Sequence, residues 1–444
     1  MISSITLAQQ KLLYGFAETP QTLLLNPGAE TNYRYHVGIP FLSGFSVNLS
    51  STNLVLGDLF LSDGIDFSTK VNRAIDKLDK DDYIHLNTSI DVLNGGFRYD
   101  DKTYLSFGFY QELDFIFYFP KDIATLINQG NEPFLNRPFS VSELAFKADI
   151  LGVLHAGISR KVDERLNIGA RVKIYSSSLN AETKNNSGTF TTIEHDTNLL
   201  RQYLSGVDVN VRSSGIVEND ETLDNPSSLY TKTFLSGNLG FGFDIGFTYH
   251  INPQLELSGS LLDVGFIKHS KSIKNFTAKG DFVFDGVNFQ YDGNNTDYWN
   301  ELDIAFEEQV PNGENQNSYI SWRPAKLNAA LKYSFGERRS KVCYADTKKG
   351  YYYNAIGVQL HSVFRPLGQQ FALTSFFEAT ITEKFHTKFT HTINDFSSKN
   401  FGFGFVGELF NVNIFGMVDN ILGLTEIARS KSTSVSFGVN MVFD

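Results

Sequence analysis

The glycines of Gly402-Phe-Gly-Phe-Val-Gly407 have the spacing of a dinucleotide-binding loop. That chemistry needs the glycines in a turn between a strand and a helix, so that pyrophosphate lies at the helix N-terminus. Here three phenylalanines alternate with Gly402 and Gly404, which is the pattern of a strand interior. We therefore predict no bound cofactor, and we expect these glycines to make room for a segment packed against the strand.

Two neighbouring predicted strands bring together side chains that could transfer protons. His386 and Lys388 should lie beside Glu378, and an ion-pair network explains this grouping better than acid–base catalysis. The nine histidines include no pair at the helical spacing of metal ligands, and no Gly-x-Ser-x-Gly elbow or His-Glu-x-x-His helix is present. We predict no catalytic residue, no metal site and no enzyme activity.

A cluster of carboxylates in one predicted loop could bind calcium, although its spacing matches no known calcium-binding loop. The carboxylates are Asp292, Asp297, Asp303 and Glu307. The cluster remains a weak hypothesis.

Composition excludes several classes of protein. The 444 residues carry a formal charge of −11, which argues against nucleic acid as a partner. The single Cys343 excludes an internal disulfide. No run of about 20 apolar residues is present, so we predict no transmembrane helix.

Alternation of apolar and polar residues is the dominant pattern. In Leu235–Ile251 one face is almost entirely apolar, whereas the other holds Asp244, His250 and several glycines. Tyr104–Phe119, Leu166–Tyr175 and the C-terminal Thr433–Asp444 repeat the pattern. A soluble sandwich alternates in the same way. However, these runs exceed the usual strand of about 5–6 residues and suit a tilted strand that crosses a bilayer.

We therefore predict an all-β fold, an antiparallel up-and-down transmembrane barrel of about 14 strands with a partly filled lumen and short helices in its outer loops. Short turns should alternate with long outer connections at residues 50–82, 119–149, 179–234 and 268–317. The expected strands are 33–49, 83–98, 102–118, 150–161, 165–178, 235–251, 254–267, 318–335, 351–364, 369–382, 384–395, 399–407, 410–419 and 432–443.

The expected lumen mixes both signs of charge. Such an interior is more typical of a filled or narrow barrel than of a wide diffusion pore, and residues 11–32 are the candidate filling. The polar side chains expected in the lumen are Glu112, Asp114, Arg171, Lys173, Asp244, Glu256, Glu378, His386 and Lys388.

The chain is divided at residue 32. Residues 1–32 are interpreted as the remnant of a signal peptide followed by a plug, because Thr6 and Ala8 could precede a cleavage site although the basic and apolar parts of a signal are missing. Residues 33–444 are expected to form a single barrel domain.

Several short stretches together resemble DUF5723, a family of Bacteroidota outer-membrane barrels of unknown function that is itself distantly similar to the long-chain fatty-acid transporter (FadL) barrels. The stretches are Leu25-Asn-Pro27, Val37-Gly-Ile-Pro-Phe-Leu42, Gly57-Asp-Leu-Phe60, Gly157-Ile-Ser-Arg-Lys161, Phe243-Asp-Ile-Gly-Phe-Thr-Tyr249, Ser258-Gly-Ser-Leu-Leu-Asp-Val-Gly265 and Asp419-Asn-Ile-Leu422. The resemblance implies the fold and an outer-membrane location, with no binding residue to carry over.

Two functions remain open. The first is an FadL-like barrel that takes up or binds a hydrophobic or amphipathic small molecule. The alternative is a non-conducting partner or scaffold in an outer-membrane secretion or assembly complex, since the broader group includes a shuttle barrel of a secretion system. In both cases the expected surroundings are outer-membrane lipid and lipopolysaccharide, with possible envelope-protein partners.

Overall fold

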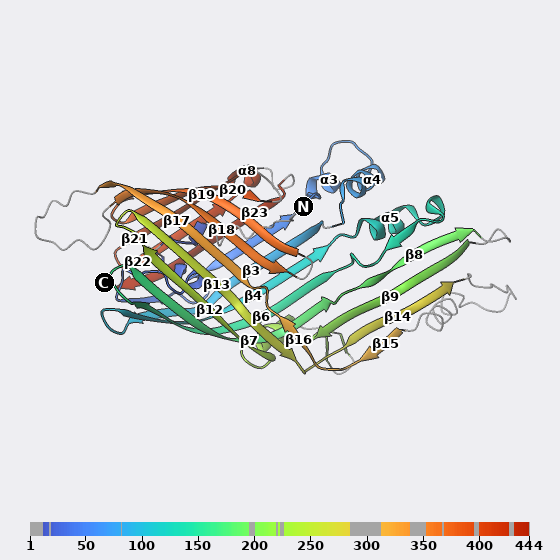
Figure 1. Ribbon diagram of the computed structural model, residues 1–444, viewed down its shortest axis with the longest axis horizontal. Helices are drawn as coiled ribbons and strands as arrows, with labels where there is room; N and C mark the ends of the chain where they lie inside the picture. Colours follow the sequence, from blue (N-terminus) through green and yellow to red (C-terminus); the bar gives the residue numbers. More distant parts are fainter. Residues whose placement is uncertain are drawn as a thin grey trace, which may run out of the picture.

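The computed structural model shows a closed antiparallel β-barrel (Figure 1). It describes residues 12–16, 19–80, 82–194, 200–218, 221–222, 226–284, 312–337, 352–365, 368–394, 399–425 and 430–443. Within them the wall has fourteen strands, and the last pairs with the first on both sides of a break. The predicted fold class is confirmed.

The strands follow one another around the wall in chain order, two of them in two pieces. They are β1 (Tyr35–Gly38) with β2 (Phe45–Ser51), β3 (Tyr83–Arg98), β4 (Thr103–Tyr118), β6 (Phe146–Lys161), β7 (Leu166–Thr183), β12 (Asn238–His250), β13 (Leu255–His269), β16 (Tyr319–Trp322) with β17 (Lys326–Glu337), β18 (Tyr352–Arg365), β19 (Gly368–Thr382), β20 (Phe385–Asn394), β21 (Asn400–Leu409), β22 (Val412–Asp419) and β23 (Ser432–Phe443).

The outer face of the wall is apolar and the inner face polar. On β12, Phe241 and Phe243 are 50% and 41% exposed, whereas Asp244, which directly follows Phe243, is completely buried. An isolated buried carboxylate would be very costly, so its burial requires the paired cations described below. The alternation predicted for this strand is confirmed.

Two predicted strands are interrupted. The strand expected at 33–49 is broken at residues 39–44, where six residues of the first strand lie opposite only Gly438 and Val439 of β23. The strand expected at 318–335 is broken at residues 323–325, where Pro324 has no N–H to donate to a ladder. A continuous apolar–polar pattern did not reveal either break.

Three of the predicted outer connections contain strands that extend the sheet beyond the barrel, as Figure 1 shows for β8, β9 and β14. β9 pairs with the end of β7, and β8 and β14 pair with β9. Expecting only loops and helix here was wrong, because this sheet depends on pairings between distant residues. The additional strands are β5 (Pro138–Ser140), β8 (Ser187–Glu194), β9 (Leu200–Ser214), β14 (Asn275–Phe284) and β15 (Asn312–Asn315), with a separate ribbon of β10 (Val217–Glu218) and β11 (Glu221–Thr222).

Helices in the described residues are short. Short helices were expected in the outer connections, and two occur there: α4 (Phe67–Lys77), capped by Asp66, and α5 (Lys121–Gln129), which follows Pro120. None of the described helices is both long and apolar enough to cross a membrane. The others are α2 (Thr22–Leu25), α3 (Leu56–Phe60), η1 (Glu132–Phe134), α6 (Pro226–Lys232) and α8 (Ile421–Thr425).

The N-terminal segment, residues 12–16 and 19–34, lies inside the barrel. Leu12, Leu13, Tyr14 and Phe16 form a buried cluster with side chains of β17, β21 and β22. This segment therefore occupies the lumen toward the end with short turns, which we call the turn end. The opposite end, from which β8, β9 and β14 project, is called the rim.

Candidate functional site: a bridged lumen

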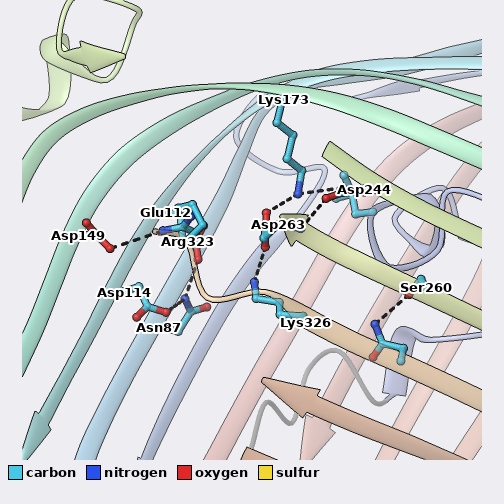
Figure 2. Close-up of polar contacts among 12 residues, drawn as sticks. Asn87, Glu112, Asp114, Asp149, Lys173, Asp244, Ser260, Asp263, Arg323 and Lys326 are labelled. Carbon is cyan, nitrogen blue, oxygen red and sulfur yellow. Dashed lines mark hydrogen bonds and ion pairs between the residues drawn. The ribbon is translucent and has the colours of Figure 1, made fainter. Parts of the chain in front are cut away.

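A buried ion network occupies the middle of the lumen (Figure 2). Lys173 Nζ lies 2.9 Å from Asp244 and 2.6 Å from Asp263, and Lys326 Nζ lies 2.9 Å from the other oxygen of Asp263. Arg171 completes the network at 3.0 Å from Asp244. Each carboxylate thus has at least two cationic partners, which offsets the cost of burial.

A second set of ion pairs bridges the lumen nearer the rim. Arg323 Nη2 lies 2.7 Å from Glu112, and Arg365 binds both oxygens of Asp114 at 2.6 and 3.0 Å. These pairs connect β4 with the opposite wall. Asn87 donates to both Glu112 and Asp114, at 3.1 and 3.0 Å, and so joins the two bridges (Figure 2).

The network is balanced in charge. Its members from the middle of the lumen to the rim are the cations Arg171, Lys173, Lys326, Arg323, Lys147 and Arg365 and the carboxylates Asp244, Asp263, Glu112, Asp149, Glu182 and Asp114. Cross-lumen pairs of this kind hold opposite walls together and leave little unpaired charge to select ions.

The remaining side chains expected in the lumen lie toward the turn end. Glu378 forms an ion pair with Lys388 at 3.0 Å, and Lys388 also donates to the carbonyl of Tyr14 at 2.7 Å. His386 bonds to Thr380 at 3.2 Å. Glu256 lies 3.2 Å from Lys332 on the adjacent strand. The structure thus pairs Glu378 with Lys388 and gives His386 and Glu256 partners of their own.

Sequence reasoning missed several members of the network. Asp263 lies on the predicted apolar face of its strand, but a bulge opposite Asp244 changes the alternation and turns it inward. Its φ of 57° marks the irregularity. Arg323 and Arg365 lie next to a strand break and at a strand end, where alternation gives no orientation. An aspartate inside an apolar face was the available signal for Asp263.

Glycines on two adjacent strands let the N-terminal segment approach the wall. Gly169 and Gly246 lie opposite each other in the β7–β12 ladder. A Cβ on Gly169 would overlap the carbonyl of Pro27, and a Cβ on Gly246 would overlap the side chain of Asn26. The glycines expected to make room, Gly402 and Gly404, lie next to Leu12 at the start of the segment.

Wall side chains satisfy the backbone of this segment. Arg171 donates to the carbonyls of Leu23 and Leu24, and Asn167 donates to those of Gly28 and Ala29. At the segment's exposed end, the hydrogen bond from His250, at 3.2 Å, lowers the pKa of Glu30. Burying polar backbone requires such partners, and the wall supplies them.

Gln21 of the N-terminal segment contacts the break in the first strand from inside the lumen. Its Nε2 donates to the carbonyl of Ser43 at 2.7 Å, and its amide exchanges hydrogen bonds with Asn440. Residues 40–42 of the break are exposed on the outer face, whereas Ser43 is buried. The backbone of the break bonds directly to both neighbouring strands, from Phe41 N–H to the carbonyl of Asp91 and from Val439 N–H to the carbonyl of Leu42, and Gln21 adds a contact from the lumen side.

A cavity lies beside Gln21, with about 740 Å³ of empty space that includes open solvent. One part of its lining is apolar, with Leu24, Leu262 and Phe415, and another is charged, with Arg171 and Lys173. A molecule in it would contact both the N-terminal segment and the ion network.

No described group of three or more His, Cys, Asp or Glu side chains could hold a metal ion. The candidate calcium ligands Asp292, Asp297, Asp303 and Glu307 lie outside the described residues.

Comparison with known families gives one match: a model described as a family of unknown function, DUF5723, matches residues 27–419. No curated protein matches the chain.

Several solved structures of bacterial proteins have a similar fold at low sequence identity. The toluene transporter TbuX of Ralstonia pickettii is 10% identical with a TM-score of 0.43, covering 100% of this chain and 99% of its own. A FadL homologue of Pseudomonas aeruginosa is 9% identical with a TM-score of 0.41, covering 97% and 95%. The toluene transporter TodX of Pseudomonas putida is 9% identical with a TM-score of 0.38, covering 99% and 97%. At these values the neighbours carry no argument about a substrate.

Proposed function

Because the chain belongs to the DUF5723 family, whose function is unknown, its activity has to be argued from its own barrel, and we propose that it is an outer-membrane barrel that takes up or binds a hydrophobic or amphipathic small molecule. The observation that carries the proposal is the half-apolar, half-charged cavity beside Gln21, which touches both the N-terminal segment and the sealed break in the first strand.

The two faces of the wall support this location. Lipid must meet apolar side chains and must not meet unpaired backbone groups, and a closed barrel with an apolar outer face meets both conditions. The exposed phenylalanines of β12, β20 and β21 fit a belt in the hydrocarbon region, including Phe243, Phe389 and Phe401. The turn end would then face the periplasm, and the rim would face lipopolysaccharide.

The lumen would act as a gated route. The cross-lumen bridges and the N-terminal segment block free diffusion, so passage requires the segment to move. Movement of the segment would also affect the break at residues 39–44, because it would remove the hydrogen bonds of Gln21 to Ser43 and Asn440. An amphipathic molecule in the cavity would contact the segment at Leu24 and Leu25 and the wall at Leu262 and Phe415.

Uptake by cells tests this function. In a bacterial host that makes the protein, radiolabelled long-chain alkyl substrates should accumulate faster than in cells without it. Leu24→Trp fills the cavity and should abolish the gain, whereas Phe243→Trp, on the outer face, should preserve it. Equal uptake by the Leu24→Trp and unaltered proteins would contradict the proposed route.

A non-conducting scaffold in an envelope assembly is the second candidate. The observation that favours it is that ion pairs bridge the lumen from β4 to the opposite wall, while β8, β9 and β14 offer a sheet outside the barrel. In planar bilayers, we expect no stable open-porin conductance from the intact protein. If the N-terminal segment is the gate, deletion of residues 1–32 should produce channels. No conductance from either the intact or the truncated protein would favour the scaffold.

A further inference from the structure

A second cavity lies at the rim, beside the break between β16 and β17. Its empty space, which includes open solvent, is about 1230 Å³. It is lined from both sides of the wall: Trp322 and Phe364 belong to the outer face and are 69% and 45% exposed, whereas Ile116 and Tyr118 are buried inside. We call this cavity the rim pocket.

The local pairing of the strands explains why the wall is open there. Among the described strands, β16 pairs with β13 alone, and its other edge has no ladder. The β17–β18 ladder reaches Lys326 and Val363, and one further bond runs from Phe364 N–H to the carbonyl of Ala325 at 2.9 Å. Pro324 cannot extend it. The edge of β16 therefore borders a notch in the wall.

The charged lining of the rim pocket is predominantly cationic. Four basic side chains, Lys147, Lys184, Arg323 and Arg365, line it with one carboxylate, Glu182. This contrasts with the chain as a whole, whose formal charge is −11. The carboxylates that pair with the two arginines lie on the lumen side, at Glu112, Asp149 and Asp114.

The two buried arginines retain unused donors. The side chains of Arg323 and Arg365 are each 1% exposed. Nε of Arg323 and Nε of Arg365 have no hydrogen-bond partner among the described residues, and Nη1 of Arg323 has only an ion pair with Asp149 at 3.7 Å. A buried guanidinium nitrogen without an acceptor carries a desolvation cost that an anionic group would remove.

We propose that the rim pocket binds an anionic amphiphile with a single alkyl chain. Its headgroup lies among Lys184, Arg323 and Arg365, and its chain passes through the notch along Trp322 and Phe364. The site rests on the proposed function only for its role as the entry point of a transported molecule, because binding itself is measured independently of uptake.

Both halves of the lining are needed for this ligand class. A neutral hydrocarbon would leave the guanidinium donors unpaired, and an inorganic anion would leave the exposed aromatic rings uncovered. A molecule with both parts satisfies both conditions, and the opening through the wall lets its chain reach lipid while its head remains inside.

Tryptophan fluorescence provides a direct test, because the chain has two tryptophans, Trp299 and Trp322. With Trp299→Phe in the full-length protein, Trp322 is the single reporter. The protein is titrated in a neutral detergent with bromododecanoate, whose bromine quenches tryptophan on contact. We expect saturable quenching, at least tenfold tighter than that by bromododecanol, which has the same chain without the charge.

Two exposed positions localise the binding. Lys184→Gln should weaken it about two- to fivefold, as for the loss of one exposed charge, and Phe364→Ala about fivefold. The matched controls are Lys102→Gln, in an exposed turn at the other end, and Phe401→Ala, equally exposed on β21. Both controls should leave the titration unchanged.

Equal quenching by the acid and the alcohol, or no change from either pocket variant, would overturn the site. Cellular uptake that persists in Lys184→Gln with weakened quenching would leave the proposed function standing and place entry elsewhere. Loss of uptake in Leu24→Trp with normal quenching would show that filling the cavity beside Gln21 stops uptake without affecting binding in the rim pocket.

The source of the ligand is distinguished in vesicles. If brominated phosphatidylglycerol quenches Trp322 more than brominated phosphatidylcholine does, the occupant is a membrane lipid. Equal quenching by the two lipids, with saturable quenching by added bromododecanoate, would identify a free amphiphile.

Discussion

Gln21 and Asn440 exchange two hydrogen bonds inside the barrel, at 3.0 and 2.9 Å, across 419 residues of chain. Asn440 is completely buried and belongs to the last strand, next to the break in the first. The amide pair therefore links the N-terminal segment to the seam at which the barrel closes.

Removal of this pair should loosen the segment. Gln21→Ala leaves the amide of Asn440 buried without its partner, a cost of about 1–3 kcal/mol. We expect short conductance bursts in planar bilayers where the unaltered protein is silent. Asn440→Ala should give a similar phenotype, and the double variant should be no worse than either single one, because the residues share one interaction.

The half-buried Gln254, in the turn before β13, supplies the control: Gln254→Ala also removes a carboxamide and should show no conductance. Silent recordings from both lumen variants would mean that the pair does not hold the segment in place.

Gly169 should be intolerant of any side chain. A Cβ there would overlap the carbonyl of Pro27, so Gly169→Ala should displace the N-terminal segment at a cost of about 1–3 kcal/mol. Limited proteolysis should then cleave within residues 19–34. Gly407→Ala is the matched control, since its Cβ would meet only Phe385 at 3.6 Å. Similar cleavage of the two variants would contradict the close approach.

A charge on the outer face should impair insertion. Phe243→Arg should cost about 2–4 kcal/mol if the residue lies near the bilayer midplane. The same substitution at Thr380, on the lumen face, should be much milder. Folded fractions can be compared by the heat-modifiable mobility of the barrel in gels. Equal losses from the two substitutions would be incompatible with the assignment of faces.

Lys173 should be the most sensitive cation of the lumen. Lys173→Met leaves Asp244 and Asp263 short of a partner, for an expected loss of about 3–5 kcal/mol. Lys332→Met breaks a more exposed pair with Glu256 and should cost at most about 1 kcal/mol. Thermal unfolding in detergent measures both. A smaller effect at Lys173 than at Lys332 would refute this ranking.

The fold could be predicted because alternation reports which face each residue occupies, and on β12 it did so from Leu239 to Tyr249. It fails where neighbouring strands contain different numbers of residues. The bulge opposite Asp244 turns Asp263 inward, and another at Asp91–Leu93 changes the faces of β3. The sequence of one strand does not show how its residues align with those of the neighbouring strand.

The polar members of the site were partly predictable for the same reason. Glu112, Arg171 and Lys173 stand on regular stretches of strand, and their inward position follows from their neighbours. Arg323, the partner of Glu112, lies in the break in the eighth strand, and Lys326, a partner of Asp263, lies beside it, so only the folded chain brings these cations to their carboxylates. The role of Gly169 was not predictable, because a glycine in a strand does not indicate which backbone approaches it.

The divided first strand also affects the order of folding. Closure requires β23 to pair with two short pieces, β1 and β2, that lie at the far end of the chain. In such long-range pairing the entropy of closing the loop is lost before the contacts that compensate for it have formed. Each piece alone offers few ladder bonds. Docking of Gln21 onto Asn440 adds contacts at that seam, so the last step of barrel closure and the seating of the N-terminal segment should occur as one cooperative event.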